Sequence, residues 1–358
     1  MTINKSLALA DSAGVTTSLL DQTLKRIGCA SVNRIGLTDA YGKFKRWHDG
    51  SEVVILLYHR VSPGDVPWLF EVPPVSPEAF ETQLQYLRSH YEVMPLNDLV
   101  QNTFIEKHSG RRIASITFDD GYKDNLSYAF PLLRKYHAPA TIFLTTAPID
   151  SRDLPWWDKI GYALTCAKNH RLSLGELGDY SLEDASQRRA IAHKIIRRLK
   201  TIPEERKNRL VEDAIRDSGV EISDELTEET MMTWQDIRAM HNEGISFGAH
   251  SVSHPILTNM PIERAASEIR ESKSQIEKRV DQIVDFFAYP NGDFNSTIAK
   301  IVEDSGFSGA VTDEPVWITP TTNLFKLGRV GLTDDFNMFR VLLSGIRGDL
   351  GRLRQVKH

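Results

Sequence analysis

The sequence predicts an α/β fold in which parallel strands alternate with helices and form a barrel. Residues 53–58 (VVILLY) and 140–146 (ATIFLTT) are continuous apolar runs, typical of parallel strands that are covered on both faces. Apolar residues recur at helical spacing over residues 76–91 and 126–136, and this alternation of strands and helices is typical of a parallel barrel. Further strands are expected at residues 93–95, 112–118, 307–311 and 323–332, and further helices at residues 96–102 and 295–306.

The chain divides into a barrel and three additions. We expect a helical leader at residues 1–50, whose function is not readable, a barrel at residues 51–340 and a basic tail at residues 341–358. Between Asp120 and His250 lie 129 residues, which is more than the few barrel units expected there. The excess predicts a largely helical insertion at about residues 151–232.

Length and composition agree with a folded enzyme. A chain of 358 residues, 41% hydrophobic and 25% charged, can bury a large core. Its formal net charge of -5 argues against a general nucleic-acid binder. The two cysteines, Cys29 and Cys166, lie far apart, so neither a disulfide framework nor a cysteine metal site is predicted.

The sequence also bears on location. The first residues, MTINKSLALADSAG, have no proper apolar stretch, so we expect no secretory signal. No run of about 18 apolar residues occurs, so we expect no transmembrane segment. We therefore expect a cytoplasmic protein, with contact to a membrane surface left open.

Two basic segments could contact a membrane surface. Residues 187–209 carry nine Lys or Arg against two Glu, and residues 340–358 carry five against one Asp. A basic amphipathic helix can lie on anionic lipid. The alternative, which we favour for residues 187–209, is a solvated basic face whose apolar stripe packs on the barrel; the stripe comprises Ile191, Ile195, Leu199 and Ile202.

Two adjacent carboxylates end the predicted central strand. Residues 116–122 read ITFDDGY, a β-type run that stops at Asp119, Asp120 and Gly121. Barrel enzymes keep their chemistry at such strand ends. Successive side chains of a strand point to opposite faces, so the two acids should not act as one equivalent pair but should have different functions. They could act as a pair only if the backbone turns there, which Gly121 allows. The alternative is a surface turn, because Asp-Gly is also common in turns.

A histidine pair ends another β-type run. Residues 246–255 read SFGAHSVSHP and place His250 and His254 just after the run. Two imidazoles and one strand-borne carboxylate make a three-ligand site with an open position for water, the arrangement of catalytic zinc.

The motifs TFDDG and HSxxH together resemble the polysaccharide deacetylases, carbohydrate esterase family four, whose shared region is the NodB homology domain. The resemblance spans roughly residues 53–332. It implies a distorted (β/α) barrel of parallel strands, here with a helical insertion, and a metal-dependent hydrolase. It implies that Asp119 is the general base and that the metal-held water attacks an N-acetyl group. The implied ligands of one divalent ion, with Zn²⁺ the expected metal, are Asp120, His250 and His254.

The segment LLYHRV resembles the start of a subgroup of this family, where it forms the first barrel strand. His59 would then touch the substrate or tune the metal site, although it could equally hydrogen-bond a loop. The proline-rich loop at residues 62–77 carries Trp68, which could form a wall of a sugar site or serve only as packing.

A third motif, DFFAYPNG at residues 285–292, runs from a strand into a turn whose N–H groups could stabilise an oxyanion. We take Tyr289, Pro290 and Asn291 as substrate-binding candidates. In the family, the matching motif has an arginine that contacts the base and a tyrosine whose N–H serves the oxyanion. Here those positions hold Ala288 and Asn291.

Arg329 is our candidate for the missing guanidinium, because the subgroup has a similar segment with an arginine near this position. An arginine beside Asp119 would favour the charged base. The alternative is an ordinary arginine on a surface strand.

The general acid is unassigned. The family uses a late histidine, but only His358 follows His254. His59 could take this role, since imidazole titrates near neutral pH. Otherwise Asp119 or metal-bound water would return the proton.

The sequence thus predicts a hydrolase that removes N-acetyl groups from an aminosugar-containing carbohydrate. The substrate would be a polysaccharide or its lipid- or nucleotide-linked precursor in envelope or exopolysaccharide metabolism. Two alternatives stay open: a non-catalytic carbohydrate-binding protein that retains the metal site, and a related deacylase of amides or O-esters.

Overall fold

The computed structural model describes residues 31, 33, 36, 38, 40, 41, 53–64, 74–105, 112–149, 151 and 153–345, with the backbone alone for residues 101–105. Most of the predicted leader, the loop residue Trp68 and the tail beyond residue 345 lie outside this description. Residues 52–332 form one compact unit, and residues 1–51 with 333–358 form another. In the latter, helix α13 (Phe336–Ser344) is bound to the leader, where Asn33 Nδ2 donates to the carbonyl of Asn337 at 2.8 Å.

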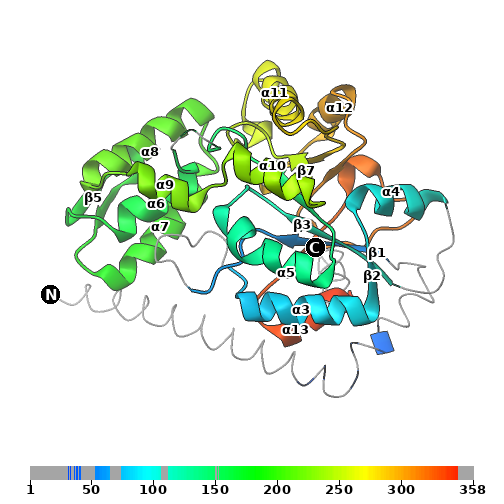
Figure 1. Ribbon diagram of the computed structural model, residues 1–358. Helices are drawn as coiled ribbons and strands as arrows, with labels where there is room; N and C mark the ends of the chain where they lie inside the picture. Colours follow the sequence, from blue (N-terminus) through cyan, green and yellow to red (C-terminus); the bar gives the residue numbers. More distant parts are fainter. Residues whose placement is uncertain are drawn as a thin grey trace, which may run out of the picture. The chain divides into compact units, whose positions relative to one another are not determined.

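The larger unit is built on an eight-stranded parallel sheet, with strand order β10-β1-β3-β4-β7-β8-β9 and β2 paired to β3. Figure 1 shows β1, β2 and β3 side by side in this sheet. The sheet curls into a half-barrel, so the predicted distorted (β/α) barrel is confirmed. Its strands are β1 (Val53–Tyr58), β2 (Tyr91–Val93), β3 (Arg112–Phe118), β4 (Ala140–Leu144), β7 (Ser246–Ala249), β8 (Phe286–Ala288), β9 (Gly309–Val311) and β10 (Val330–Gly331).

The central strands are buried over nearly their whole length, as their apolar sequences require. All six residues of β1 and all five of β4 are buried, which fits a parallel sheet covered on both faces. Strands β1 and β3 pair in register from Val53 with Ile113 to Tyr58 with Phe118. The acids that follow Phe118 therefore lie at the carboxyl end of the sheet, beside the residues that follow Tyr58.

The predicted strand at residues 323–332 is wrong for most of its length. Leu324–Lys326 form a short 3-10 helix, and only Val330–Gly331 pair with β1. Leu327 instead bridges to Val311 of β9. The chain thus crosses from β9 to β1 at Gly328, where a Cβ would lie 2.1 Å from Val316 Cγ2. This crossing links the two ends of the sheet.

Helices cover the sheet, and several begin where the sequence predicted. Ser76 caps the first of them, because its hydroxyl accepts from Ala79 N–H at 3.2 Å, and Asn295 caps α12 in the same way. The strand expected at residues 93–95 starts earlier, at Tyr91, directly after the helix. The helices are α3 (Pro77–His90), α4 (Leu96–Ile105), the π-helix η1 (Asn125–Ala129), α5 (Phe130–Tyr136), α10 (Trp234–Asn242), α11 (Ile262–Val280) and α12 (Ser296–Asp304). Short 3-10 helices lie at η3 (Leu257–Asn259), η4 (Pro290–Gly292) and η5 (Leu324–Lys326).

The insertion is a lobe with its own hydrophobic core, drawn mainly in green in Figure 1. It contains a short hairpin as well as helices, and Pro203 separates α7 from α8 within the basic segment. Its elements are α6 (Trp156–Thr165), β5 (Arg171–Ser173), η2 (Gly175–Leu177), β6 (Asp179–Ser181), α7 (Ala185–Leu199), α8 (Glu204–Ser218) and α9 (Asp224–Thr230).

The apolar stripe of the basic segment packs inside this lobe and not on the barrel, which corrects our expectation. Ile195 and Leu199 are buried in the core of the lobe, and Ile191 and Ile202 pack against that core. The stripe is therefore not free to enter a lipid surface. The described part of the chain contains no candidate for a membrane-spanning helix.

Candidate active site

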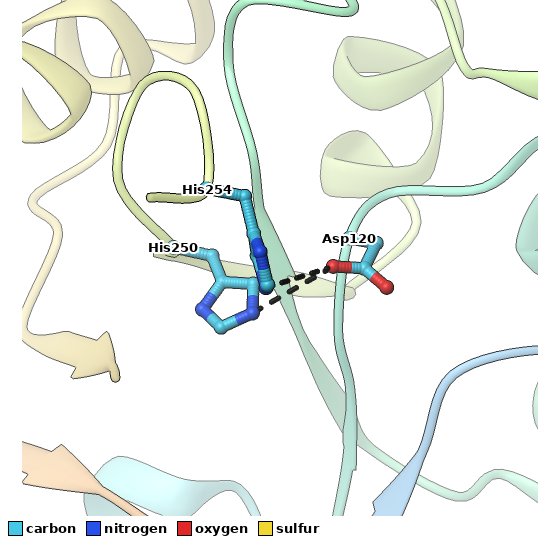
Figure 2. Close-up of side chains that lie close together, drawn as sticks. All are labelled: Asp120, His250 and His254. Carbon is cyan, nitrogen blue, oxygen red and sulfur yellow. Dashed lines mark ion pairs between the residues drawn. The ribbon is translucent and has the colours of Figure 1, made fainter. Parts of the chain in front are cut away.

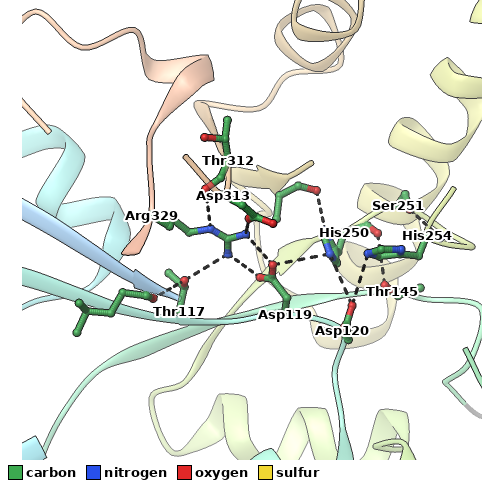
Figure 3. Close-up of polar contacts among 12 residues, drawn as sticks. Thr117, Asp119, Asp120, Thr145, His250, Ser251, His254, Thr312, Asp313 and Arg329 are labelled. Carbon is green, nitrogen blue, oxygen red and sulfur yellow. Dashed lines mark hydrogen bonds and ion pairs between the residues drawn. The ribbon is translucent and has the colours of Figure 1, made fainter. Parts of the chain in front are cut away.

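Asp119 is held by an arginine from the crossing segment. The carboxylate is buried, with 1% of its surface exposed, and Arg329 donates to both of its oxygens at 2.6 Å (Figure 3). Burial opposes ionisation of Asp119, but the positive charge of Arg329 and these two hydrogen bonds outweigh it and lower its pKa. Asp119 is thus a charged group in a fixed orientation.

Arg329 is itself fixed on every side. It is fully buried, and Nη2 also donates to Asp313 Oδ1 at 2.9 Å. Nε donates to the carbonyl of Thr312 at 3.2 Å, and Nη1 donates to Thr117 Oγ1 at 3.3 Å. These contacts come from the segment after β9 and from β3, so two parts of the barrel that are far apart in sequence hold one guanidinium.

Asp120 points elsewhere because the backbone turns at this residue. Its φ is 75°, in the left-handed region, and Gly121 follows with a φ of 86°. Asp120 Oδ1 lies 3.6 Å from His250 Nε2 and 3.7 Å from His254 Nε2 (Figure 2). Burial and the nearby charge of Asp119 raise the pKa of Asp120 well above its usual range. The two adjacent acids therefore have different partners.

His250 is oriented by a carbonyl from the third motif. Its Nδ1 lies 2.7 Å from Ala288 O, which can only accept, so Nδ1 carries the proton and Nε2 keeps its lone pair. His254 adopts a φ of 55°, and its N–H donates to Ser251 Oγ at 3.0 Å. Burial lowers the pKa of both histidines, which keeps them neutral as metal ligands must be.

The three side chains fit a divalent metal ion. One ligand atom from each of Asp120, His250 and His254 lies within 4.8 Å of the others. Asp120 Oδ1 is buried and accepts no hydrogen bond from the described residues, as expected for an atom whose partner is a cation. One carboxylate and two imidazoles are a ligand set typical of catalytic zinc.

The other predicted site residues divide into two groups. His59 is partly buried and follows β1 beside Asp119, whose N–H donates to Tyr58 O at 3.1 Å. Burial lowers the pKa of His59, while the charges of Asp119 and Asp313 oppose this effect. Asn291 lies in the turn after β8, with a φ of 54° and an Nδ2 that has no partner among the described residues.

Tyr289 and Pro290, in contrast, are buried. The hydroxyl of Tyr289 donates to Phe325 O at 3.1 Å, and its ring stacks on Phe294 at 4.7 Å. The side chain of Tyr289 is thus fully buried beneath the turn, and the assignment of Tyr289 and Pro290 as substrate-binding residues stays a prediction.

Several residues of the site were missed in the sequence. Asp313 follows β9 at the same barrel end, so the strand-end rule that found Asp119 could have found it. Trp157, from the first helix of the insertion, packs its ring 4.4 Å from that of His254. Its Nε1 donates to Tyr122 OH at 2.8 Å, and Tyr122 OH donates to Asp158 at 2.9 Å. No sequence pattern indicates these contacts, because they depend on how the insertion packs against the barrel.

Known proteins resemble the chain in sequence. The family model for polysaccharide deacetylase matches residues 106–310. The Bacillus subtilis (strain 168) protein YxkH, a candidate polysaccharide deacetylase, is 24% identical over 281 residues, which are 78% of this chain and 71% of YxkH. Poly-beta-1,6-N-acetyl-D-glucosamine N-deacetylase of Staphylococcus epidermidis is 37% identical over 79 residues, 22% of this chain and 27% of that protein.

Solved structures resemble its fold. The deacetylase PplD of Streptococcus pyogenes, in complex with acetate, aligns with a TM-score of 0.55 and 19% identity over 81% of this chain and 97% of its own. IcaB from Ammonifex degensii aligns with a TM-score of 0.53 and 18% identity over 83% of this chain and 97% of its own. These likenesses concern the fold of the barrel.

Proposed function

Since the chain belongs to the polysaccharide deacetylase family and is a deacetylase-like hydrolase of C–N bonds, we propose that it removes N-acetyl groups from an aminosugar-containing carbohydrate. We assign Asp119 as the general base. We assign Asp120, His250 and His254 as the ligands of one divalent ion, with Zn²⁺ as the native metal. Within the family, we place the chain in the subgroup with the YHRV start and the FAYPNG motif.

One observation carries this proposal: the ion pair of Arg329 and Asp119 lies beside the three-ligand cluster. His250 Nε2 is 3.8 Å from Asp119 Oδ2 and 3.6 Å from Asp120 Oδ1. A charged carboxylate and a potential Lewis-acid site thus share one buried corner of the barrel. The pairing of Arg329 with Asp119 also supports the subgroup assignment, because Ala288 stands where the family motif has its arginine.

In the proposed reaction, the bound metal supplies Lewis-acid chemistry, lowering the pKa of water and polarising the acetyl carbonyl. Asp119 accepts a proton from the attacking water, and Arg329 keeps the carboxylate ionised and oriented for this step. The water oxygen bonds to the acetyl carbon. The backbone N–H of Asn291, in the left-handed turn after β8, is our candidate donor to the oxyanion that results.

The reaction is completed when the C–N bond breaks and the sugar nitrogen takes up a proton. We propose that His59 carries this proton. Because burial lowers its pKa, the imidazole starts neutral and would first accept the proton from Asp119 and then pass it to the leaving amine. The products are acetate and a free amine.

For the substrate, we propose a polymer that contains N-acetylglucosamine or its lipid- or nucleotide-linked precursor, in envelope or exopolysaccharide metabolism. The name of the Staphylococcus epidermidis relative supports poly-β-1,6-N-acetylglucosamine as the first compound to test.

The test is product analysis with Zn²⁺-loaded protein and four substrates: the β-1,6 polymer, a chitin oligosaccharide, UDP-N-acetylglucosamine and an O-acetylated sugar. We expect acetate and free amine in equal amounts from at least one N-acetylated compound. Acetate from the O-acetylated sugar alone would contradict N-deacetylation and support an O-ester deacylase. Binding of the polymer without any acetate would support the carbohydrate-binding alternative.

We further propose a cytoplasmic location. The exposed free thiol of Cys166 is compatible with a reducing compartment. Any contact with a membrane surface would be electrostatic, since the apolar stripe of the basic segment is buried. Fractionation of cells that express the tagged chain checks this proposal. Recovery in the soluble fraction, or salt-released membrane association, is expected, and an extracellular protein would contradict it.

A further inference from the structure

We infer that Glu268 is a positioning residue that holds the loop between the two histidines and thereby fixes His254 in the metal site. This inference rests on the proposed function of Asp120, His250 and His254 as metal ligands. Glu268 lies on α11, outside the motifs that carry the family resemblance, and contacts none of these ligands itself.

One carboxylate accepts three hydrogen bonds from this loop. The N–H groups of Val252 and Ser253 both donate to Glu268 Oε2 at 2.8 Å. The hydroxyl of Ser253 donates to Oε1, also at 2.8 Å. Hydrogen bonds to an ionised acceptor are about twice as strong as those between neutral groups. Glu268 thus ties two consecutive backbone groups that immediately precede His254.

The loop needs such support because two of its residues adopt an unfavourable backbone conformation. Ser251 has a φ of 65° and His254 a φ of 55°, and neither is a glycine. Residues in the left-handed region persist only where their surroundings enforce this conformation. The N–H of His254 already donates to Ser251 Oγ, so the loop is held from inside by Ser251 and from outside by Glu268.

His254 depends on its backbone more than His250 does. The ring of His250 is oriented through Nδ1 by the carbonyl of Ala288. Nδ1 of His254 is buried and has no hydrogen-bond partner among the described residues, which leaves the backbone and the ring of Trp157 to orient the imidazole. Metal sites usually fix each histidine through a hydrogen bond to its second ring nitrogen. His254 has no such bond among the described residues, and Glu268 instead constrains the backbone that carries it.

Helix α11 is a rigid support for this carboxylate. Ala265 and Ile269, on either side of Glu268 along the helix, are fully buried. The helix has 19 residues and runs beside β7, the strand that precedes His250. Glu268 therefore connects the loop to a long helix that is packed beside the sheet.

The test is the affinity of the metal-free protein for Zn²⁺, measured by competition with a chromophoric chelator. We expect Glu268→Ala to bind Zn²⁺ about 10- to 100-fold more weakly than the wild type. The matched control is Glu271→Ala, on an exposed part of the same helix, where Ser267 is the one donor to the carboxylate among the described residues. This control should bind Zn²⁺ like the wild type.

A second variant and a second readout separate positioning from general stability. Glu268→Gln keeps the shape and one acceptor oxygen but loses the charge, so it should have an affinity between those of the wild type and Glu268→Ala. Melting temperatures of the metal-free variants report on the fold alone. A Glu268→Ala or Glu268→Gln protein that melts earlier but binds Zn²⁺ as tightly as the wild type would overturn this role. A wild type that binds no Zn²⁺ would overturn the metal site itself, a different result.

Discussion

Arg329 contacts both carboxylate oxygens of Asp119 from the segment that links the two ends of the sheet. In the sequence the two residues are 210 positions apart. The barrel brings them together because Asp119 follows β3, while Arg329 directly precedes β10, whose partner β1 also pairs with β3. The orientation of the proposed base thus depends on how the barrel closes.

Replacement of Arg329 should reduce turnover even where the fold survives. Arg329→Lys keeps the positive charge but replaces two nitrogens in a fixed plane with a single ammonium group, which no longer fixes the orientation of Asp119. We therefore expect kcat to fall about 100-fold with little change in KM. Arg329→Ala leaves a buried carboxylate unpaired and should also destabilise the fold by about 3–5 kcal/mol. Steady-state kinetics and thermal unfolding measure the two effects.

The control for this pair is Lys326→Ala, since Lys326 forms an exposed ion pair with Glu314 at 3.4 Å. Exposed pairs contribute about 1 kcal/mol or less, so this variant should behave like the wild type. An Arg329→Ala enzyme with nearly full turnover would refute the role of the guanidinium.

Removal of metal should abolish turnover and lower stability together. A chelator should eliminate acetate release, and added Zn²⁺ should restore it. Because the ion binds only the folded state, Zn²⁺ at 100 times its Kd should stabilise the protein by about 2.7 kcal/mol, seen as a higher melting temperature. Asp120→Asn should lose most of this stabilisation. A chelated protein that keeps its full rate would argue against a metal-dependent reaction.

The turn after β8 should be sensitive to a single methyl group. At Gly292, where φ is 70°, a Cβ would lie 2.9 Å from the backbone nitrogen of Asp313, a partner of Arg329. Gly292→Ala should therefore lower both stability and kcat. Gly244→Ala is the matched control, because Gly244 also has a positive φ, of 94°, but no atom within 4 Å of its Cβ position.

Both variants should lose about 1–2 kcal/mol of unfolding free energy, since an L-residue is strained at a positive φ. Gly292→Ala should lose more than Gly244→Ala, because its Cβ also crowds the backbone of Asp313. Only Gly292→Ala should lower turnover as well. Equal kcat values for the two variants would show that the contact with Asp313 has no functional role.

His59 should matter for proton transfer rather than for binding. We expect His59→Gln to reduce kcat by about 100-fold or more, the usual contribution of a positioned acid or base, while Zn²⁺ affinity stays unchanged. Kinetics and metal titration are compared in the same preparation. Loss of metal affinity with a preserved rate per bound metal would instead assign His59 to support of the metal site.

The position of the candidate site could be predicted from the sequence, because the carboxyl ends of parallel strands always meet at one edge of the sheet. Asp120 follows β3 and His250 follows β7, and parallel strands bring their carboxyl ends to one edge. The apolar runs before Asp120 and His250 identified the two strands, so the sequence could predict that the aspartate and the histidines lie close together. The turn at Asp120 itself was not, because a positive φ at an aspartate depends on surrounding contacts.

Other contacts depend on packing that no spacing rule describes. Glu268 reaches the histidine loop because α11 passes beside it, and Trp157 reaches His254 because the insertion folds back on the barrel. The segment at residues 323–332 looked like one strand, since its apolar residues suit a strand. In the structure it changes partners at Gly328, and this crossing carries Arg329 to Asp119.

The central claim is that Asp119 acts on water beside a metal held by Asp120, His250 and His254. The most direct measurement is acetate release by Zn²⁺-loaded Asp119→Asn, with bound metal quantified in the same sample. We predict about one Zn²⁺ per chain and a rate at least 100-fold below that of the wild type, because the ligands remain while the base is gone. A metal-loaded Asp119→Asn protein that releases acetate at the wild-type rate would contradict this account.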